Sequence, residues 1–150
     1  MAIQLQGDEL QPFQQFLADY CAAYGSMNIN RISEFFSKTA LHCYGTGEDE
    51  VLLNREALLY GLQRDFSELH SVAMRPEGTL TAIQVGEDTI CLCWLLHVEY
   101  SLKTHPDQTT SLPKLRYTMM LEQQGDWRVV HCHISAPLGA KGSGRSFPEA

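Results

Sequence analysis

Two histidines one residue apart, His131 and His133, lie in an apolar run near the end of the sequence, GDWRVVHCHISAP. His-x-His on a strand points both imidazoles to one face, where they could bind zinc or iron if another strand supplied a third ligand. The obvious third ligands are His97 and Glu99. The alternation of side chains along two separate strands does not by itself place these two residues and the two histidines on one face of the sheet, so we expect no metal. The histidines are then either hydrogen-bonded structural residues or part of a ligand pocket.

A lone arginine, Arg116, lies among apolar and aromatic residues in LRYTMML, and no acidic residue occurs between Gln108 and Leu121. A buried guanidinium needs an anion or several hydrogen-bond acceptors. We therefore expect Arg116 to face a cavity and to hold an anionic or carbonyl oxygen of a ligand. The alternative is an arginine exposed at an edge of the fold.

The other reactive side chains form no catalytic set that can be recognised in the sequence. There is no Ser/His/Asp triad and no glycine-rich phosphate loop, and Cys91-x-Cys93 lacks the second cysteine pair of a zinc site. His42 could act as a base in principle, because an imidazole titrates near neutrality, although a lone histidine on a short strand is more often a packing residue. The five cysteines are an odd number in apolar segments, which predicts buried free thiols, a reducing compartment and no disulfide.

Length and charge restrict the class of protein. The 150 residues fit one domain, and the net charge of -7 comes without any cluster of Lys or Arg, so nucleic acid is not an expected partner. The first residues lack the basic start and apolar core of a signal peptide, and no window is long enough to span a membrane. We expect a cytoplasmic protein with no membrane partner.

Three helices are predicted in the first half of the chain. Aromatic and aliphatic residues recur at steps of three and four over residues 12–24, with Pro12 where a helix can start and Gly25 where it can stop. A second, short helix is predicted over residues 30–37. The third begins after Asn54, which can cap it, and extends to Leu69.

After His70 the period becomes twofold, which predicts four long antiparallel strands in two hairpins. Their turns are expected at residues 86–88 and 124–126, with THPDQTTSLP as a loop between the hairpins and residues 139–150 as a flexible tail after a domain of residues 1–138. Alternation predicts the residues that share a face of two strands. On the strand after Asp88, Ile90, Leu92, Trp94, Leu96, Val98 and Tyr100 share one face, and Cys91, Cys93, Leu95, His97 and Glu99 share the other. On the last strand, Trp127, Val129, His131, His133 and Ser135 share one face.

These elements predict an α+β fold, a cone of three N-terminal helices packed on a strongly bent antiparallel sheet, with a ligand cavity at its open end. Neither face of the strand after Asp88 is fully polar. We therefore expect at least a homodimer that buries the face of Cys91, Cys93 and Leu95.

Three segments resemble a known family over residues 13–137. GDWRVVHCHISAP resembles the Gly-x-Trp-x-x-x-His-x-His-x-Ser signature of SnoaL-like domains, in the nuclear transport factor 2-like superfamily, and of the association domain of calcium/calmodulin-dependent protein kinase II. VGEDTICLCWLLHVEY resembles a strand pair of that association domain, and LRYTMML resembles the Arg-x-Thr strand of SnoaL-like proteins. The resemblance implies the cone fold and a cavity-lining Arg116. It also implies a less cationic cavity than in the kinase domain, whose pocket arginine corresponds to Leu96.

The superfamily includes isomerases, polyketide cyclases, dehydratases, transport factors and assembly domains, so the resemblance leaves function open. The aspartates that steroid-isomerase-like members carry on the first strand are missing from KTALHCYGTG, where Thr39, His42, Cys43 and Tyr44 stand instead. The leading hypothesis is a protein that binds a small organic ligand, which could carry a carboxylate, and oligomerises through its sheet. The alternatives are a cofactor-independent isomerase, cyclase or dehydratase of a polyketide- or steroid-like substrate, and an assembly module without a ligand. We assign no catalytic residue, metal or cofactor. The expected ligand-contacting residues are Tyr20, Tyr44, Trp94, Tyr100, Arg116, His131 and His133.

Overall fold

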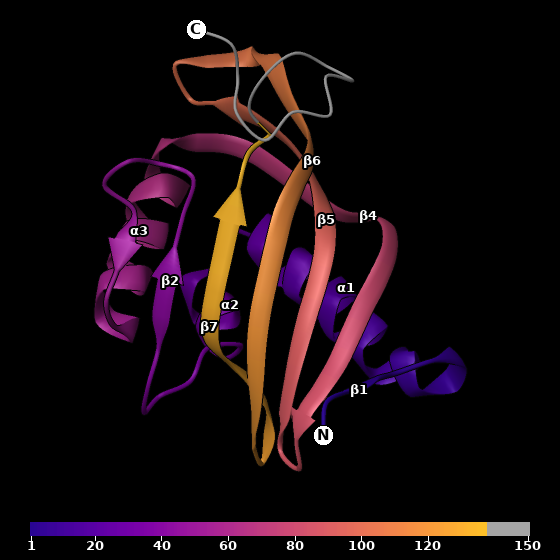
Figure 1. Cartoon of the computed structure of the whole chain (residues 1–150). Coiled ribbons are helices and arrows are strands. Elements are labelled where there is room, and N and C mark those ends of the chain that lie inside the picture. Colours follow the sequence, from indigo (N-terminus) through magenta and orange to yellow (C-terminus); the bar gives the residue numbers. More distant parts are fainter. Residues whose placement is uncertain (138–150) are drawn as a thin grey trace, which may run out of the picture.

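The computed structural model describes residues 1–137 and consists of a bent, mixed sheet of seven strands with helices packed against one face (Figure 1). The strand order is β1-β4-β5-β6-β7-β2-β3. Four long strands, each antiparallel to its neighbour in the chain, form the body of the sheet. They are β4 (Leu69–Gly86), β5 (Thr89–Leu102), β6 (His105–Gln124) and β7 (Asp126–Ser135). The predicted α+β cone with two long hairpins is thereby confirmed.

Three short strands complete the sheet at its two edges. β1 (Ile3–Gln4) pairs with the end of β4, while β2 (His42–Tyr44) and β3 (Val51–Leu52) form the opposite edge. β2 runs parallel to β7, and its three residues pair with residues 131–133. The sheet is therefore mixed, whereas the sequence predicted an antiparallel one.

The helices follow the caps read from the sequence. A short 3-10 helix, η1 (Gly7–Leu10), leads into α1 (Gln11–Gly25), and the Asn54 side chain accepts a bond from the Ala57 amide at the start of α3 (Arg55–Glu68). α2 (Ile29–Ser33) is shorter than predicted. The chain leaves the helix there because residues 35–37 pair with β7: the Val129 amide donates to the Phe35 carbonyl and the Ser37 amide donates to the Val129 carbonyl.

The segment THPDQTTSLP is not a loop. It extends the β5–β6 hairpin, with His105 opposite Leu102 and Thr110 opposite Tyr100. Its threonines favour extended backbone, and residues 110–112 pair with β5, beyond a register shift that separates them from His105. The predicted tail, and the domain boundary at residue 138, lie outside the described residues.

The long strands divide the molecule into an inner face, covered by helices, and an outer face. β5 alternates as predicted: Leu92, Trp94, Leu96 and Val98 are buried on the inner face, whereas His97 between them lies on the outer face. Among the described residues no helix has the length and apolar content needed to cross a bilayer.

The last strand departs from simple alternation. Leu121 pairs with Val129 and Met120 pairs with His131, so Val130 is an extra residue, a β-bulge. Val129 and Cys132, three residues apart, are consequently both buried on the inner face. The prediction that Val129 shares a face with His131 and His133 is wrong for this reason.

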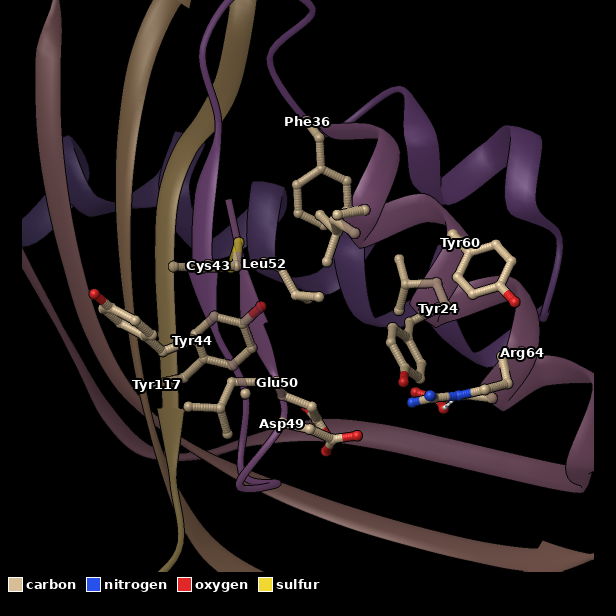
Figure 2. Close-up of a pocket in the computed structure, with 18 of the residues that line it drawn as sticks. Tyr24, Phe36, Cys43, Tyr44, Asp49, Glu50, Leu52, Tyr60, Arg64 and Tyr117 are labelled. Atoms are coloured by element: carbon tan, nitrogen blue, oxygen red, sulfur yellow. Dashed lines mark ion pairs between the residues drawn. A yellow bond between two sulfur atoms is a disulfide. The ribbon is translucent and has the colours of Figure 1, made fainter. Parts of the chain in front are cut away.

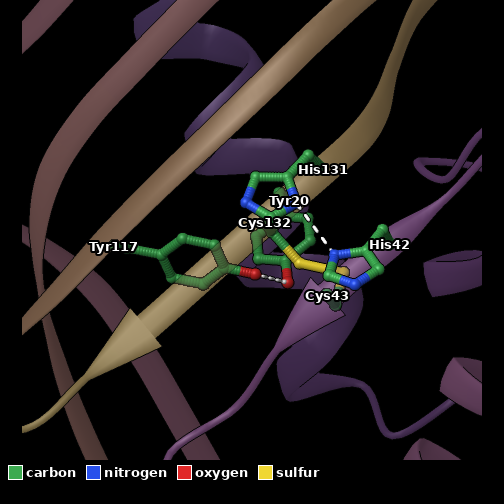
Figure 3. Close-up of a disulfide and its surroundings, with 6 residues drawn as sticks. All are labelled: Tyr20, His42, Cys43, Tyr117, His131 and Cys132. Atoms are coloured by element: carbon green, nitrogen blue, oxygen red, sulfur yellow. Dashed lines mark hydrogen bonds between the residues drawn. A yellow bond between two sulfur atoms is a disulfide. The ribbon is translucent and has the colours of Figure 1, made fainter. Parts of the chain in front are cut away.

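A disulfide links the inner faces of β2 and β7. Cys43 and Cys132 are direct cross-strand partners with their Cα atoms 4.7 Å apart, and they are joined by their sulfurs (Figure 3). The expectation that all five cysteines are free is therefore wrong. Cys21, Cys91 and Cys93 are free thiols. With one pair of cysteines linked, the cysteines no longer support a reducing compartment, and the compartment stays a prediction.

Candidate ligand pocket

A cavity of about 270 Å³ lies between α1, α3 and the inner face of the sheet (Figure 2). α1 contributes Tyr20 and Tyr24 to its wall, and α3 contributes the face that carries Gly61 and Asp65. The sheet contributes residues from β2, β3, β4, β6 and β7, and most of the exposed wall is apolar. The volume is close to the lower end of the range for ligand sites, roughly 300–1,000 Å³.

Two tyrosine hydroxyls meet in the wall of this cavity. Tyr20 Oη and Tyr117 Oη are 2.7 Å apart, and both side chains are buried. Burial raises the pKa of each phenol, so both stay protonated at neutral pH. Since only one of the two protons is used between them, the other O–H can donate to a ligand oxygen. The Cys43–Cys132 disulfide lies beside the pair (Figure 3).

Ionisable groups line the rest of the cavity. Figure 2 shows Tyr24 and Arg64 on the helical side and Asp49 and Glu50 on the segment that leads into β3. Burial, reinforced by Asp65 and Glu50, raises the pKa of the Tyr24 hydroxyl. Burial also raises the pKa of Asp65, although Arg64 opposes this effect. Three carboxylates against one guanidinium make this part of the wall acidic, which disfavours an anionic ligand.

Only some of the aromatic residues that were expected to contact a ligand line this cavity. Tyr20 lines the cavity, and Tyr100 lines an adjoining hollow that shares Tyr24 and Asp65 with it. Trp94 is buried behind the wall, where its ring stacks on Tyr117 at a centroid distance of 4.9 Å. The Trp94 indole N–H has no hydrogen-bond partner among the described residues.

Arg116 does not face the cavity. Leu115 and Tyr117 on either side of it are buried on the inner face, so alternation turns Arg116 to the outer face, where it is exposed. The apolar neighbours that suggested a buried guanidinium are inner-face residues of the same strand. The expectation that Arg116 holds a ligand oxygen in this cavity is therefore wrong.

The two histidines of the opening motif also lie on the outer face. His131 is opposite His42 and His133 is opposite Tyr44, and the four rings form one cluster. Tyr44 contributes to the cavity lining but its ring packs against His133. The His42 and His131 Nδ1 atoms are 3.4 Å apart, and burial, with repulsion from neighbouring imidazoles, lowers the pKa of His131. Within residues 1–137 no group of three His, Cys, Asp or Glu side chains could hold a metal ion.

Tyr117 and Asp65 are among the cavity residues that the sequence analysis missed. Tyr117 could have been found from alternation along LRYTMML, because it and Arg116 must point to opposite faces. Asp65 follows Arg64 on a helix with many polar residues, and nothing in that pattern distinguishes it from a solvated side chain.

Comparison with known proteins agrees with this architecture. A family model described as SnoaL-like domain matches residues 14–139, which is most of the chain. No curated protein sequence matches the chain.

Several solved structures share the fold at low sequence identity. A proposed calcium/calmodulin-dependent protein kinase II association domain from Xanthomonas campestris is 16% identical, with a TM-score of 0.72 over 88% of this chain and 89% of that chain. A nuclear transport factor 2-like superfamily protein from Salmonella enterica is 11% identical, with a TM-score of 0.75 over 91% and 96%. A proposed scytalone dehydratase from Novosphingobium aromaticivorans is 10% identical, with a TM-score of 0.76 over 87% and 85%. These likenesses establish the fold alone.

Proposed function

The chain belongs to the SnoaL-like domain family, and on that premise we propose that it binds a small organic molecule in the cavity between α1, α3 and the sheet. The observation that carries the proposal is the Tyr20–Tyr117 hydroxyl pair in the wall of a largely apolar cavity. Such a pair offers one phenol proton to a ligand oxygen, while the apolar wall holds the remainder of the molecule.

Charge and size narrow the class of ligand. The carboxylate-bearing ligand expected from Arg116 loses its support, because that guanidinium is exposed on the outer face. Asp49, Glu50 and Asp65 favour a neutral or cationic molecule instead. At about 270 Å³ the cavity suits a ligand smaller than most drug-sized molecules. A neutral ring compound with one carbonyl or hydroxyl oxygen fits both limits.

Gly61 provides a matched test. A Cβ atom placed on this α3 residue would meet no other atom within 4 Å, and the residue lines the cavity. Gly61→Leu should fill the cavity, whereas Gly61→Ala should leave most of it open. In a thermal-shift screen of small cyclic ketones and phenols, we expect ligands that stabilise the native protein and Gly61→Ala but not Gly61→Leu. Equal stabilisation of all three proteins would place binding elsewhere.

The hydroxyl pair can be tested in the same screen. Tyr117→Phe removes one member and should weaken a ligand that accepts its proton about 2- to 10-fold, the usual range for one neutral hydrogen bond. Tyr60→Phe is the control, because the Tyr60 side chain also lines the cavity but is 72% exposed.

Asp65 supports a second candidate function, proton-transfer catalysis. Burial moves the pKa of Asp65 upward, which is the direction that favours a carboxyl as a general acid or base, and the phenol pair could stabilise a developing oxyanion. An isomerase or dehydratase of this design needs no cofactor. Asp65→Asn should leave ligand affinity within about twofold and abolish turnover. Turnover that survives this substitution would remove Asp65 from the reaction.

Self-association through the outer face is a separate proposal. Cys91 and Cys93 are half-buried there, Leu95 is 36% exposed, and Val85 on β4 is 43% exposed. An apolar strip of this kind is more easily explained by a second copy of the chain than by solvent.

A further inference from the structure

Three neighbouring strands present a serine, a histidine and a glutamate in a row on the outer face. The Ser111 hydroxyl on β6 is 2.9 Å from His97 Nε2 on β5, and His97 Nδ1 is 3.0 Å from Glu77 Oε1 on β4. A nucleophile bonded to one imidazole nitrogen, with a carboxylate bonded to the other, is the arrangement that activates serine in hydrolases.

The glutamate is held in position from two sides. Its Oε1 bonds to His97, and its Oε2 accepts a hydrogen bond from the Lys114 amide at 2.9 Å. These two bonds, with the nearby charge of Arg75, lower the pKa of Glu77 and keep it ionised. An ionised carboxylate that is held by two hydrogen bonds fixes the orientation of the imidazole. It also stabilises the imidazolium that forms when the imidazole gains a proton.

The histidine and serine differ in exposure in the way that the chemistry needs. The His97 side chain is 12% exposed, whereas Ser111 is exposed. Glu99 also approaches His97 Nε2, at 3.3 Å, which is farther than the serine hydroxyl. In the tautomer whose Nδ1–H donates to Glu77, Nε2 carries no proton, so it can accept the Ser111 proton and makes no hydrogen bond to Glu99.

We propose that Ser111 is a nucleophile that small activated esters can acylate, with His97 as its general base and Glu77 as the positioning residue. The Ser111 Oγ forms a bond to the ester carbonyl carbon while its proton passes to His97 Nε2. The C–O bond to the leaving group breaks, and the departing oxygen takes that proton. Water then forms a bond to the acyl carbon and gives one proton to His97 Nε2. The bond between the acyl carbon and Ser111 Oγ breaks, Oγ takes that proton, and the carboxylic acid is released.

This site is independent of the ligand pocket. Leu96 and Val98, on either side of His97, are buried on the inner face, so the sheet separates Ser111 from the cavity. Nothing in the proposal depends on a ligand of the pocket.

A fluorophosphonate probe tests the nucleophile directly, because the serine oxygen displaces fluoride and the adduct stays on the protein. After incubation and digestion, mass spectrometry should find the adduct on Ser111. His97→Gln should slow labelling at least about 100-fold, the lower end of what a positioned general base contributes. Glu77→Gln should slow it at least about tenfold, since it removes the charge that orients the imidazole.

Ser67→Ala is the matched control. Ser67 is exposed, and its hydroxyl donates to the Arg64 carbonyl at 2.6 Å instead of to an imidazole. This variant should label as fast as the native protein, and Ser111→Ala should not label. Absence of an adduct on Ser111, or labelling of His97→Gln at the native rate in a variant that keeps the native melting temperature, overturns the proposal.

Discussion

Reduction of the Cys43–Cys132 disulfide should lower the free energy of unfolding by about 2–4.6 kcal/mol. The bond joins residues 89 positions apart, and the chain-entropy relation for a loop of that length gives about 4.6 kcal/mol at 25 °C as the upper value. The lower value is the one typically measured when disulfides are removed. With a urea m-value of about 2 kcal/mol/M, the midpoint should fall by about 1–2 M.

The assay compares urea unfolding with and without a reductant, and with Cys43→Ala/Cys132→Ala. The reduced protein and the double variant should share the lower midpoint, and Cys93→Ala should keep the native midpoint because Cys93 is a free thiol. Alkylation in urea without reductant should modify three of the five cysteines. If all five react, or if reductant leaves the midpoint unchanged, the linkage and the reasoning from it are refuted.

Four other measurements follow from single positions. Gly61→Ala should raise the free energy of unfolding by about 0.5–1 kcal/mol in urea titrations, because the helix gains a better former in open space; a loss would mean that a neighbour is displaced. Asp65 has a raised folded-state pKa, so its ionisation destabilises the fold as pH rises; Asp65→Asn should raise the melting temperature at pH 7 but not at pH 3, and the reverse order would contradict the burial argument. His131 has a lowered pKa in the folded state, so its contribution to the stability of the fold is complete above about pH 6.5 and is lost as pH falls below that value. In His131→Gln the melting temperature should therefore depend less on pH below about 6.5, and an unchanged pH dependence would assign the effect to other groups. Light scattering should give at least a dimer mass for the native chain and a monomer mass for Leu95→Glu, and a native monomer would refute self-association through the outer face.

Local patterns predicted the helices and the two long hairpins because the information is local. The Asn54 cap, the helical stripe after it and the twofold alternation of β5 all act between residues close in sequence. The same reasoning failed at Val130, where one inserted residue reverses the facing of every side chain beyond it. A bulge depends on the partner strand, so the sequence of β7 alone did not reveal it.

The candidate sites were harder to predict because their members are distant in the chain. Tyr20 meets Tyr117 across 97 positions, and the Cys43–Cys132 pair depends on β2 lying parallel to β7. The hydrogen bonds that join Glu77, His97 and Ser111 depend on the register of three strands, and no residue spacing within one segment predicts them. Arg116 was wrongly placed in the cavity because its neighbours in the sequence are buried on the inner face, whereas its own side chain is exposed on the outer face.

The parallel pairing of β2 with β7 affects how the chain can fold as it is synthesised. Residues 42–44 leave the ribosome long before residues 131–133, their partners in the sheet. Until then β2, β3 and the cavity wall that they form have no sheet to join, and Tyr20 must also wait for Tyr117. Contacts of such sequence separation slow folding, and nascent chains that lack β7 would expose the apolar inner face to chaperones or to one another.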